Sequence, residues 1–351
     1  MINKKFWKNK KILITGHTGF KGRWFSIILR LLGSEVYGIS LHEKKNYKKI
    51  EYMNFLKQKN CFNVDIIDKK EIQKIFLKIN PEIIIHMAAQ SKVIDGLKFP
   101  VKTFETNYMG TINVLNSTAI LKKIKTILIV TTDKVYENNK KVRRFSESDK
   151  LGGDDPYSAS KASSEIIIDY YRKLMPKTKI ISVRAGNIIG GGDFGENRII
   201  PDLIKAWIKN EKLLVRNPKS TRPWQYVLDV LITYMKLIEK SYKLKKMPLI
   251  FNVGPFKSNL SVDNLVHKLK IYFKDLKIIY EKRKNINFEK KHLFLDIKNS
   301  VNFLKLKNDI DFNDRIQRTS VFYKQILNTK KNYEIEKIYK NEALAFLSKK
   351  L

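Results

Sequence analysis

Short apolar runs alternate with amphipathic stretches throughout the first half of the chain. The runs are nearly continuous and rich in β-branched residues, as is typical of strands with helices on both faces. This alternation predicts βαβ units and therefore a parallel sheet between two layers of helices. The expected strands are Lys11–Thr15, Glu35–Ser40, Cys61–Val64, Ile83–His86, Thr126–Thr131 and Lys179–Val183, and the expected helices are Gly19–Leu32, Lys69–Ile79, Val101–Leu121 and Ser158–Leu174.

The pattern changes after Val183, where glycine, proline, polar residues and single aromatic residues replace the regular alternation. Ile250–Val253 predicts one more strand of the main sheet, and another strand is expected near Leu276–Tyr280 within a mostly helical region. We therefore expect a main α/β domain over residues 1–185 with a return at 226–254. A smaller lobe should comprise residues 186–225 and 255–330, followed by a helical tail over residues 331–351.

Composition limits the class of protein. The chain has 351 residues, of which 43% are hydrophobic, enough to bury a sizeable core. It contains neither an apolar run long enough to span a membrane nor a signal-peptide segment after its basic start. Cys61 is its only cysteine, which excludes an intramolecular disulfide and a cysteine-based metal cage. We expect a cytoplasmic protein with no metal site and no membrane partner.

The formal net charge is +36, carried mostly by lysines that are spread along the whole chain. We interpret this charge as a solvated surface and expect no nucleic-acid partner. The alternative is a non-catalytic basic binding protein, whose binding to RNA or DNA would weaken with salt. The positive field would also attract small anionic substrates.

The first predicted strand runs directly into three glycines spaced Gly-x-x-Gly-x-x-Gly. Residues without a Cβ allow a tight turn and let backbone N–H groups approach a pyrophosphate at the start of a helix. The position between a strand and a helix favours dinucleotide binding over an incidental turn. The cofactor candidates in this turn are Gly16, His17, Gly19, Phe20, Lys21 and Gly22.

The second predicted strand leaves the choice of dinucleotide open. Enzymes that use NAD often place an acidic residue there to bind the ribose, and an arginine often marks NADP. This chain has Ser40, Leu41, His42, Glu43 and Lys44, with neither an Asp at the strand end nor an Arg.

Tyr157 and Lys161 form a Tyr-x-x-x-Lys motif at the start of a predicted helix. This spacing places the phenol and the ammonium group on one helix face. A neighbouring cation favours the phenolate, so we expect a tyrosine pKa lowered toward neutrality and a usable base.

Thr132, Asp133 and Lys134 directly follow the fifth predicted strand. Ligands in such sheets bind at the carboxyl ends of the strands, which places Thr132 beside Tyr157 and a substrate hydroxyl. Asp133 and Lys134 supply an acid and a base, as an elimination requires. For Lys134 to act as the base, burial or Lys161 should depress its pKa.

Seven motifs in the same order give the chain a specific resemblance over about residues 6–330. They are Gly16–Gly22, Thr132–Lys134, Leu151–Lys161, Arg184–Asn187, Gly190–Asp193, Arg198–Asp202 and Arg222–Gln225. Together they resemble the CDP-glucose 4,6-dehydratase family of extended short-chain dehydrogenases/reductases. Lys134 is the most telling residue, because the dTDP-glucose and GDP-mannose dehydratases have Glu at this position.

The resemblance implies an α/β fold, namely a Rossmann-type doubly wound parallel sheet with a smaller C-terminal substrate-binding lobe. It also implies NAD as cofactor, with NADP still open, and a homodimer or higher homo-oligomer formed through helices Val101–Leu121 and Ser158–Leu174. The pathway implied is deoxysugar biosynthesis for lipopolysaccharide O-antigen. Beyond the glycine turn, the implied cofactor residues are Asp65, Ile66, Ala88, Ala89, Asn107, Tyr157 and Lys161.

The reaction that the resemblance implies converts CDP-glucose to CDP-4-keto-6-deoxyglucose. Tyr157 would remove the C4 hydroxyl proton while the C4 hydride passes to NAD. Lys134 would take the C5 proton, Asp133 would protonate the departing C6 hydroxyl, and the hydride would return to C6. The implied substrate-binding residues are Gln90, Asn187, Arg198, Arg216 and Arg222.

One segment departs from the family pattern. Where the family has an arginine-rich segment ending in Ser-Tyr, this chain has residues 91–97, with Ile94, Asp95 and Leu97 in place of arginine and tyrosine. This segment should form a wall of the substrate pocket, so a dehydratase for another nucleotide hexose remains an alternative. An NAD(P)-dependent epimerase or reductase is a second one, although Asp133 and Lys134 argue against it.

Overall fold

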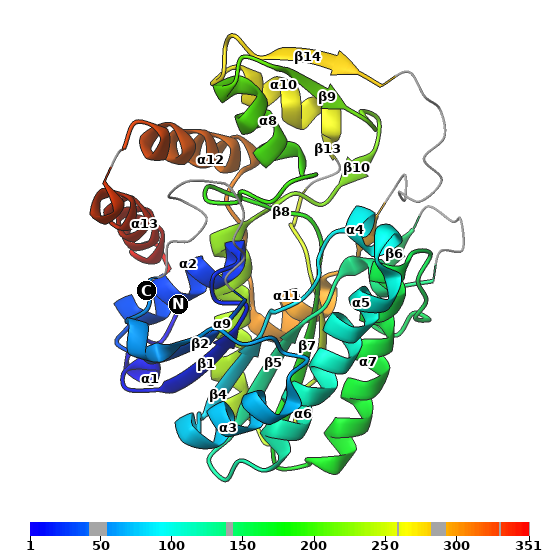
Figure 1. Ribbon diagram of the computed structural model, residues 1–351, viewed down its shortest axis with the longest axis vertical. Helices are drawn as coiled ribbons and strands as arrows, with labels where there is room; N and C mark the ends of the chain where they lie inside the picture. Colours follow the sequence, from blue (N-terminus) through cyan, green and yellow to red (C-terminus); the bar gives the residue numbers. More distant parts are fainter. Residues whose placement is uncertain (42–54, 138–142, 258–259, 282–292, 330, 351) are drawn as a thin grey trace.

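The computed structural model describes residues 1–41, 55–137, 143–257, 260–281, 293–329 and 331–350. It shows a layered α/β domain with a smaller lobe above one end of its sheet (Figure 1). The helices are α1 (Lys4–Trp7), α2 (Phe20–Leu31), α3 (Lys69–Ile79), α4 (Val93–Lys98), α5 (Pro100–Phe104), α6 (Gly110–Ala119), α7 (Pro156–Leu174), α8 (Ile199–Ile208), α9 (Val227–Lys243), α10 (Val262–Lys270), α11 (Lys298–Leu304), α12 (Phe312–Leu327) and α13 (Asn332–Leu347), with short η1 (Gln58–Asn60), η2 (Glu105–Met109) and η3 (Asp133–Val135).

Within the described residues, seven parallel strands form the main sheet in the order β12-β7-β5-β4-β1-β2-β3. The chain order reverses between β1 and β4, which creates the crevice where ligands bind in open α/β sheets. All six strands predicted in the first half are present, as is the return strand β12. Their bounds are β1 (Lys11–Thr15), β2 (Glu35–Ile39), β3 (Cys61–Phe62), β4 (Ile83–His86), β5 (Thr126–Val130), β7 (Lys179–Ala185) and β12 (Ile250–Val253).

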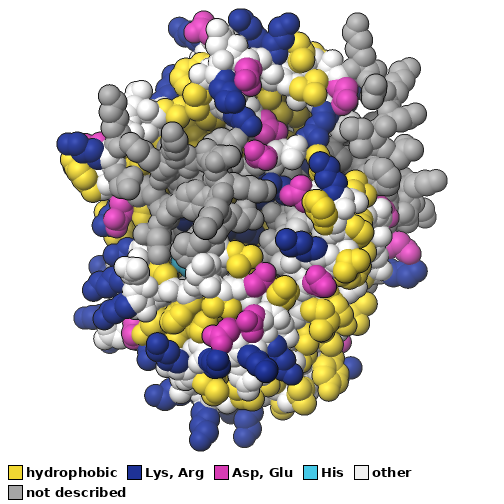
Figure 2. Space-filling model, viewed as in Figure 1, with side chains coloured by type: hydrophobic (Ala, Val, Ile, Leu, Met, Phe, Trp, Pro, Cys, Tyr) yellow, Lys and Arg dark blue, Asp and Glu magenta, His cyan; other side chains and the backbone are white. Residues whose placement is uncertain are grey.

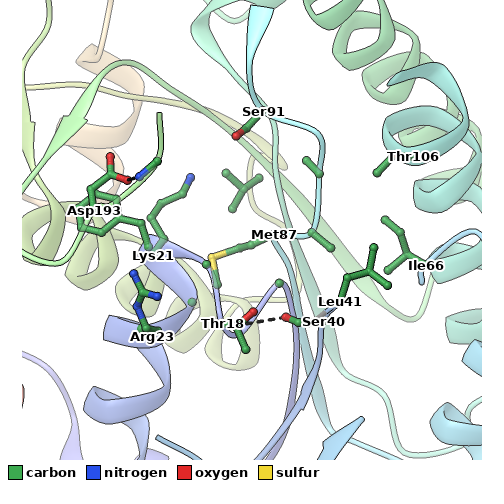
Figure 3. A pocket seen from close by; sticks show the side chains of 18 of the residues that line it. Thr18, Lys21, Arg23, Ser40, Leu41, Ile66, Met87, Ser91, Thr106 and Asp193 are labelled. Atoms are coloured by element: carbon green, nitrogen blue, oxygen red, sulfur yellow. Dashed lines mark hydrogen bonds between the residues drawn. The ribbon is translucent and has the colours of Figure 1, made fainter. Parts of the chain in front are cut away.

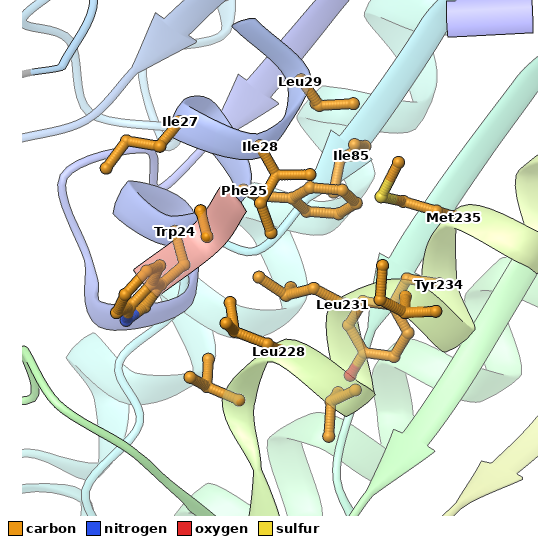
Figure 4. Close-up of a cluster of buried hydrophobic side chains, with 14 of the residues drawn as sticks. Trp24, Phe25, Ile27, Ile28, Leu29, Ile85, Leu228, Leu231, Tyr234 and Met235 are labelled. Atoms are coloured by element: carbon orange, nitrogen blue, oxygen red, sulfur yellow. The ribbon is translucent and has the colours of Figure 1, made fainter. Parts of the chain in front are cut away.

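Successive residues of these strands enter two separate hydrophobic cores, because side chains alternate between the faces of a sheet. Ile12 and Ile14 of β1 pack with α2 and α9 on one face, whereas Leu13 packs with α3, α6 and α7 on the other. Figure 4 shows Phe25 and Ile28 of α2 facing the α9 side chains across the first core. The predicted doubly wound fold is therefore confirmed.

The smaller lobe has its own core, built from α8, α10 and α12 over two short strand pairs. Its amphipathic helix α8 lies in a region where the sequence pattern indicated no regular element. The predicted strand near Leu276–Tyr280 is present and pairs in parallel with a strand of this lobe. The remaining strands are β6 (Arg144–Phe145), β8 (Ile188–Ile189), β9 (Lys212–Val215), β10 (Thr221–Arg222), β11 (Gln225–Tyr226), β13 (Leu260–Ser261), β14 (Lys277–Tyr280) and β15 (Phe294–Leu295).

Two helical regions differ in detail from the expectation. The predicted helix Val101–Leu121 is divided into α5, the π-helical segment η2 and α6. Helix α13, expected as a tail, packs against α2, and the Tyr339 ring lies 4.6 Å from that of Trp24. The backbone N–H of Ile2 donates to Lys350, so the two ends of the described chain meet beside this helix. None of the described helices has the length and apolar character needed to cross a membrane.

Candidate active site

The glycine turn between β1 and α2 is packed too closely for side chains. Gly16 has a φ of 77°, and a Cβ there would lie 2.8 Å from the backbone nitrogen of Ala88. A Cβ on Gly22 would lie 2.1 Å from the carbonyl oxygen of Gly16. Gly19 precedes α2 without a side-chain cap, which leaves the first N–H groups of the helix available to an anion.

A cavity of about 440 Å³, the turn cavity, opens over this turn at the carboxyl ends of the strands. In Figure 3, Lys21, Arg23 and Asp193 lie on one side of it, and Ile66 and Thr106 lie on the other. It is long enough to combine the glycine turn with the catalytic helix α7. The predicted residues that line it are Gly16, Gly19, Phe20, Lys21, Gly22, Asp65, Ile66, Ala88, Ala89, Tyr157, Lys161 and Arg198.

The turn cavity fits a dinucleotide. Its glycines form a cradle that a single Cβ would fill, and the N-terminus of α2 supplies donors for a pyrophosphate. Ser40 takes the place of an acid at the end of β2, and its hydroxyl accepts the Thr18 N–H at 3.2 Å. His42, Glu43 and Lys44, considered above for the choice of dinucleotide, lie outside the described residues.

The pKa of Lys21 in the turn cavity is far below the ordinary value for a lysine. Burial and, to a smaller extent, repulsion by Lys161 and Arg198 together lower the pKa of its ammonium group to about 7. A bound phosphate would offset both effects, because it supplies an opposite charge at the same place. The cluster of cations therefore favours an anionic ligand.

Three predicted ligand-binding residues do not line either cavity described here. The buried His17 ring packs on β2, where a Cβ on Gly38 would lie 2.2 Å from the ring, so the expected contact with the cofactor is not met. Asn107 is also buried, and its amide both accepts from Gln90 N and donates to Gln90 O. The Gln90 side chain donates to Lys92 O and to a threonine hydroxyl, both 3.0 Å away. Asn107 and Gln90 therefore shape the wall of the site.

The catalytic candidates meet where β5 ends and α7 begins. Asp155 caps α7 by accepting the Ser158 N–H at 3.0 Å, which places Tyr157 in the first helical turn. Thr132 hydrogen bonds to Tyr157, and its hydroxyl also donates to Asp133 at 3.0 Å. Asp133 is buried and Lys134 is half-buried on the short helix η3.

The predicted lowering of the Tyr157 pKa is wrong for the protein by itself. The pKa of the phenol is raised to about 12, because burial and the charge of Asp133 outweigh the hydrogen bond with Thr132 and the charge of Arg198. The pKa of the buried Lys161 is lowered to about 8, because desolvation outweighs the attraction of Glu165. Its Nζ donates to Val130 O at 3.3 Å. Desolvation outweighs the helix spacing on which the prediction depended.

A buried polar network supports this catalytic segment. The Glu165 carboxylate accepts from Thr131 at 2.6 Å and pairs with Arg184 at 3.1 Å. Arg184 also donates to the Tyr136 hydroxyl at 3.0 Å, and Tyr136 directly follows η3. The network thus connects α7, which carries Tyr157, to the chain on both sides of residues 132–134.

A second cavity of about 190 Å³, the lobe cavity, is lined by residues of the smaller lobe. Four predicted substrate-binding residues line it, namely Asn187, Arg198, Arg216 and Arg222. Arg198 lines both cavities, is paired with Asp193 at 2.9 Å and donates to Ser91 Oγ at 2.8 Å. Ser91 therefore forms part of the wall of the turn cavity, whereas Ile94, Asp95 and Leu97, at which the family pattern is broken, line neither cavity.

The sequence analysis missed two acidic residues at these cavities. Asp193 holds Arg198, and Asp202 lines the lobe cavity from the first turn of α8. Both belong to the segments that carried the resemblance, and each is bonded to a residue five positions away, Asp193 to Arg198 and Asp202 to Asn197.

Known proteins share these features. Residues 12–254 match the model of the NAD dependent epimerase/dehydratase family. The chain is 36% identical to the CDP-glucose 4,6-dehydratase of Salmonella typhimurium over 69% of this chain and 70% of that one. It is 27% identical to the dTDP-D-glucose 4,6-dehydratase of Dictyostelium discoideum over 93% of this chain and 84% of that one.

A solved structure supports the fold. The epimerase Mth375 of Methanothermobacter thermautotrophicus superposes with a TM-score of 0.81 at 19% identity, covering 92% of this chain and 95% of that chain. The glycine cradle, the Tyr157–Lys161 pair and the family match agree on the cofactor and the fold. The chain therefore belongs to the NAD-dependent epimerase/dehydratase family.

Proposed function

We propose that this protein is a hydro-lyase that converts CDP-glucose to CDP-4-keto-6-deoxyglucose. The observation that carries the proposal is the hydrogen-bonded group of Asp133, Thr132 and Tyr157 at the end of β5, with Lys134 next to Asp133 on the short helix η3. Oxidation and reduction at one carbon require only a base such as Tyr157. A separate acid and base are needed to remove water across two carbons.

The first step is removal of the C4 hydroxyl proton by Tyr157. Thr132 holds the phenol by a hydrogen bond, and Lys161 brings a positive charge to the same buried site. The glycine turn would hold NAD, which would supply the redox chemistry, a hydride taken up from C4 and given back to C6. The 4-ketone acidifies the neighbouring C5–H bond.

The elimination then uses the two residues on η3. Lys134 takes the C5 proton, and Asp133 protonates the C6 oxygen as water leaves. Asp133 is buried against Gly186, where a Cβ would lie 3.1 Å from its carboxylate.

The substrate diphosphate would bind in the lobe cavity. Arg198, Arg216 and Arg222 line it, and the planar arginine side chain suits bidentate contacts with phosphate. Because Arg198 also lines the turn cavity, this placement directs the hexose toward Tyr157.

The proposal is tested by incubating the purified protein with CDP-, dTDP-, UDP- and GDP-hexoses and following the 4-keto product under alkali. CDP-glucose should give a 4-keto-6-deoxy sugar, and Lys134→Ala should slow this turnover by at least about 100-fold, as for loss of a positioned base. Lys150→Ala, which removes an exposed lysine paired with Glu137, is the matched control. Full activity of Lys134→Ala would remove the proposed base, and absence of keto product with every substrate would refute the dehydratase.

An epimerase or reductase of the same fold is the competing function. Such an enzyme would use Tyr157 and Lys161 but would release a product that still carries its C6 hydroxyl. Mass spectrometry separates the two, because the dehydratase product is lighter by one water.

We also propose a homodimer formed through the outer face of α5, α6 and α7. Val101, Ile166 and Tyr170 are 71%, 65% and 56% exposed there, and Figure 2 shows hydrophobic side chains gathered over this part of the molecule. A monomer rarely leaves such a patch open to water. Ile166→Glu should shift the protein from dimer to monomer in sedimentation, whereas Ile208→Glu, at an exposed isoleucine of the other lobe, should not.

A further inference from the structure

The lobe cavity contains a carboxylate that phosphate binding does not explain. Asp202 lines this cavity together with three arginines. A negative charge in a pocket for a diphosphate repels the ligand unless the carboxylate receives a hydrogen bond from another part of it. Among the residues that the structure describes, Asp193 is the other acid in the lining, and it is already paired with Arg198.

The position of Asp202 is well defined. It lies in the first turn of α8, and its Oδ1 accepts the backbone N–H of Asn197 at 3.1 Å. Burial raises the pKa of its carboxyl group, while the charges of Arg216 and Lys205 act against this effect. The side chain therefore stays fixed in a partly desolvated place, where a hydrogen bond to a ligand counts more than in water.

The surroundings of Asp202 suit a nucleobase better than a sugar. Helix α8 packs on β9, and the cavity there is walled by Ile199, Leu214 and Val262. These three apolar side chains offer an aromatic ring a surface to pack on, which a hydroxylated sugar would use less well. These residues do not line the turn cavity that holds Tyr157, so they lie toward the end of the substrate away from the reacting hexose.

The hydrogen-bonding edge of the base decides between the pyrimidines. Cytosine presents an amino donor at C4 next to a ring-nitrogen acceptor, whereas uracil and thymine present a carbonyl acceptor next to an N–H donor. Asp202 is an acceptor, and Arg216, whose charge reaches it, brings donors to the same side. An acceptor beside a donor complements the amino group and the ring nitrogen of cytosine. With uracil or thymine, the same groups would place acceptor against acceptor and donor against donor.

We propose that Asp202 is the residue that selects cytidine nucleotides, by accepting a hydrogen bond from the 4-amino group of cytosine. The inference rests on the proposed function only in taking the lobe cavity as the nucleotide site. It adds a determinant of the base, which the departure at residues 91–97 had left open.

The test is calorimetric titration of CDP, UDP, dTDP and GDP into the wild type and the Asp202→Asn variant. The wild type should bind CDP at least about tenfold more tightly than UDP, a typical preference for one well-placed base contact. Asparagine can still accept the Asn197 N–H, so the fold should be retained, as an unchanged Tm would show. Its amide offers both a donor and an acceptor, so the preference should fall to within about threefold.

Glu211→Gln provides the matched control. It removes one negative charge from the same lobe at an exposed residue that does not line the cavity. Both variants lose a negative charge and should therefore attract every phosphate ligand more strongly. This gain affects CDP and UDP alike, so it cancels in the ratio of their dissociation constants. In the control, that ratio should remain at the wild-type value.

Two results would overturn the inference. The ratio of the CDP and UDP dissociation constants could be unchanged in Asp202→Asn, as when both nucleotides weaken equally through a contact with ribose, or GDP could be the tightest ligand of the wild type. These binding results are independent of turnover. Selective CDP binding without any keto product would refute the proposed reaction and leave the inference standing, whereas turnover of CDP-glucose with an unchanged ratio would refute the inference alone.

Discussion

The two cavities bind anionic ligands by different means. The turn cavity uses backbone, with glycines and the N-terminus of α2, and its lining comes largely from consecutive residues at strand ends. The lobe cavity uses long side chains, with Arg216 and Arg222 from short strands and loops of a separate core. A backbone site fails when any atom is added to it, whereas a side-chain site can change its ligand by a single substitution. The turn cavity is therefore suited to the cofactor, and under the proposed function the lobe cavity would determine the substrate.

The largest expected effect comes from adding one methyl group to the backbone site. In Gly22→Ala, the Cβ would lie 2.1 Å from the Gly16 carbonyl and 2.7 Å from the Cα of His17, and both are backbone atoms that cannot rotate away. Overpacking of about 3 kcal/mol corresponds to at least about a 100-fold loss of NAD affinity. Calorimetry with NAD measures this loss, and circular dichroism checks the fold.

Gly33→Ala is the control for this change. Gly33 has a φ of 84° at the other end of α2, but the nearest atom to its Cβ would be Lys8 Cγ at 3.6 Å. We expect about 1 kcal/mol of destabilisation from the left-handed backbone and unchanged NAD binding. Tight NAD binding by Gly22→Ala would show that the turn can widen to accept a side chain. It would refute the claim that the backbone site tolerates no added atom.

The next effect concerns the buried network that holds the catalytic segment. Glu165→Gln should cost about 3 kcal/mol of unfolding free energy, because it leaves the charge of Arg184 buried without its partner. Attraction by Arg184 and a hydrogen bond from Thr131 lower the pKa of Glu165. Its stabilisation is therefore present above the ordinary carboxyl pKa and is lost as the pH falls through the folded-state value. The wild type and the variant should consequently become more alike in acid.

Urea denaturation at pH 7 and at acidic pH measures both expectations. Asp169→Asn is the control, since Asp169 is 60% exposed and pairs with Arg172 at 3.5 Å, an arrangement that contributes under about 1 kcal/mol. Equal destabilisation by the two variants would mean that the buried pair of Glu165 and Arg184 contributes no more to stability than an exposed ion pair.

The same contrast explains how much the sequence could predict. The strands of the main sheet and the glycine turn depend on local pattern, and the structure has them where the pattern indicates. Helix α8 was not predicted because its surroundings are irregular, and the hydrogen bond from Arg198 to Ser91 depends on a tertiary contact between residues far apart in the sequence. The error at Tyr157 has the same origin, since spacing along a helix carries no information about desolvation.

The side-chain site should respond to substitution independently of the backbone site. Arg222→Met should weaken CDP binding by about 30-fold, as expected for about 2 kcal/mol from hydrogen bonds to a charged group, and leave NAD binding unchanged. Arg198→Met should weaken both ligands, because Arg198 lines both cavities. Calorimetric titration of each ligand into each variant separates these outcomes, and a loss of NAD affinity in Arg222→Met would contradict the division into two sites.

The smallest expected effect is a pH dependence of NAD binding through Lys21. The pKa of Lys21 is lowered to about 7, so below pH 7 the ammonium group is charged and attracts the pyrophosphate, whereas above pH 7 binding must first take up a proton. Affinity should therefore fall as the pH rises from 6 to 9, by at most about tenfold per pH unit for one linked proton. Titrations in two buffers with different ionisation enthalpies measure the proton uptake directly.

Lys21→Met should remove both the uptake and the pH dependence, whereas Lys8→Met, at an exposed lysine outside the cavity, should keep them. Proton uptake that persists in Lys21→Met would assign the linkage to Lys161, whose pKa near 8 makes it the other group in the turn cavity that titrates in this range.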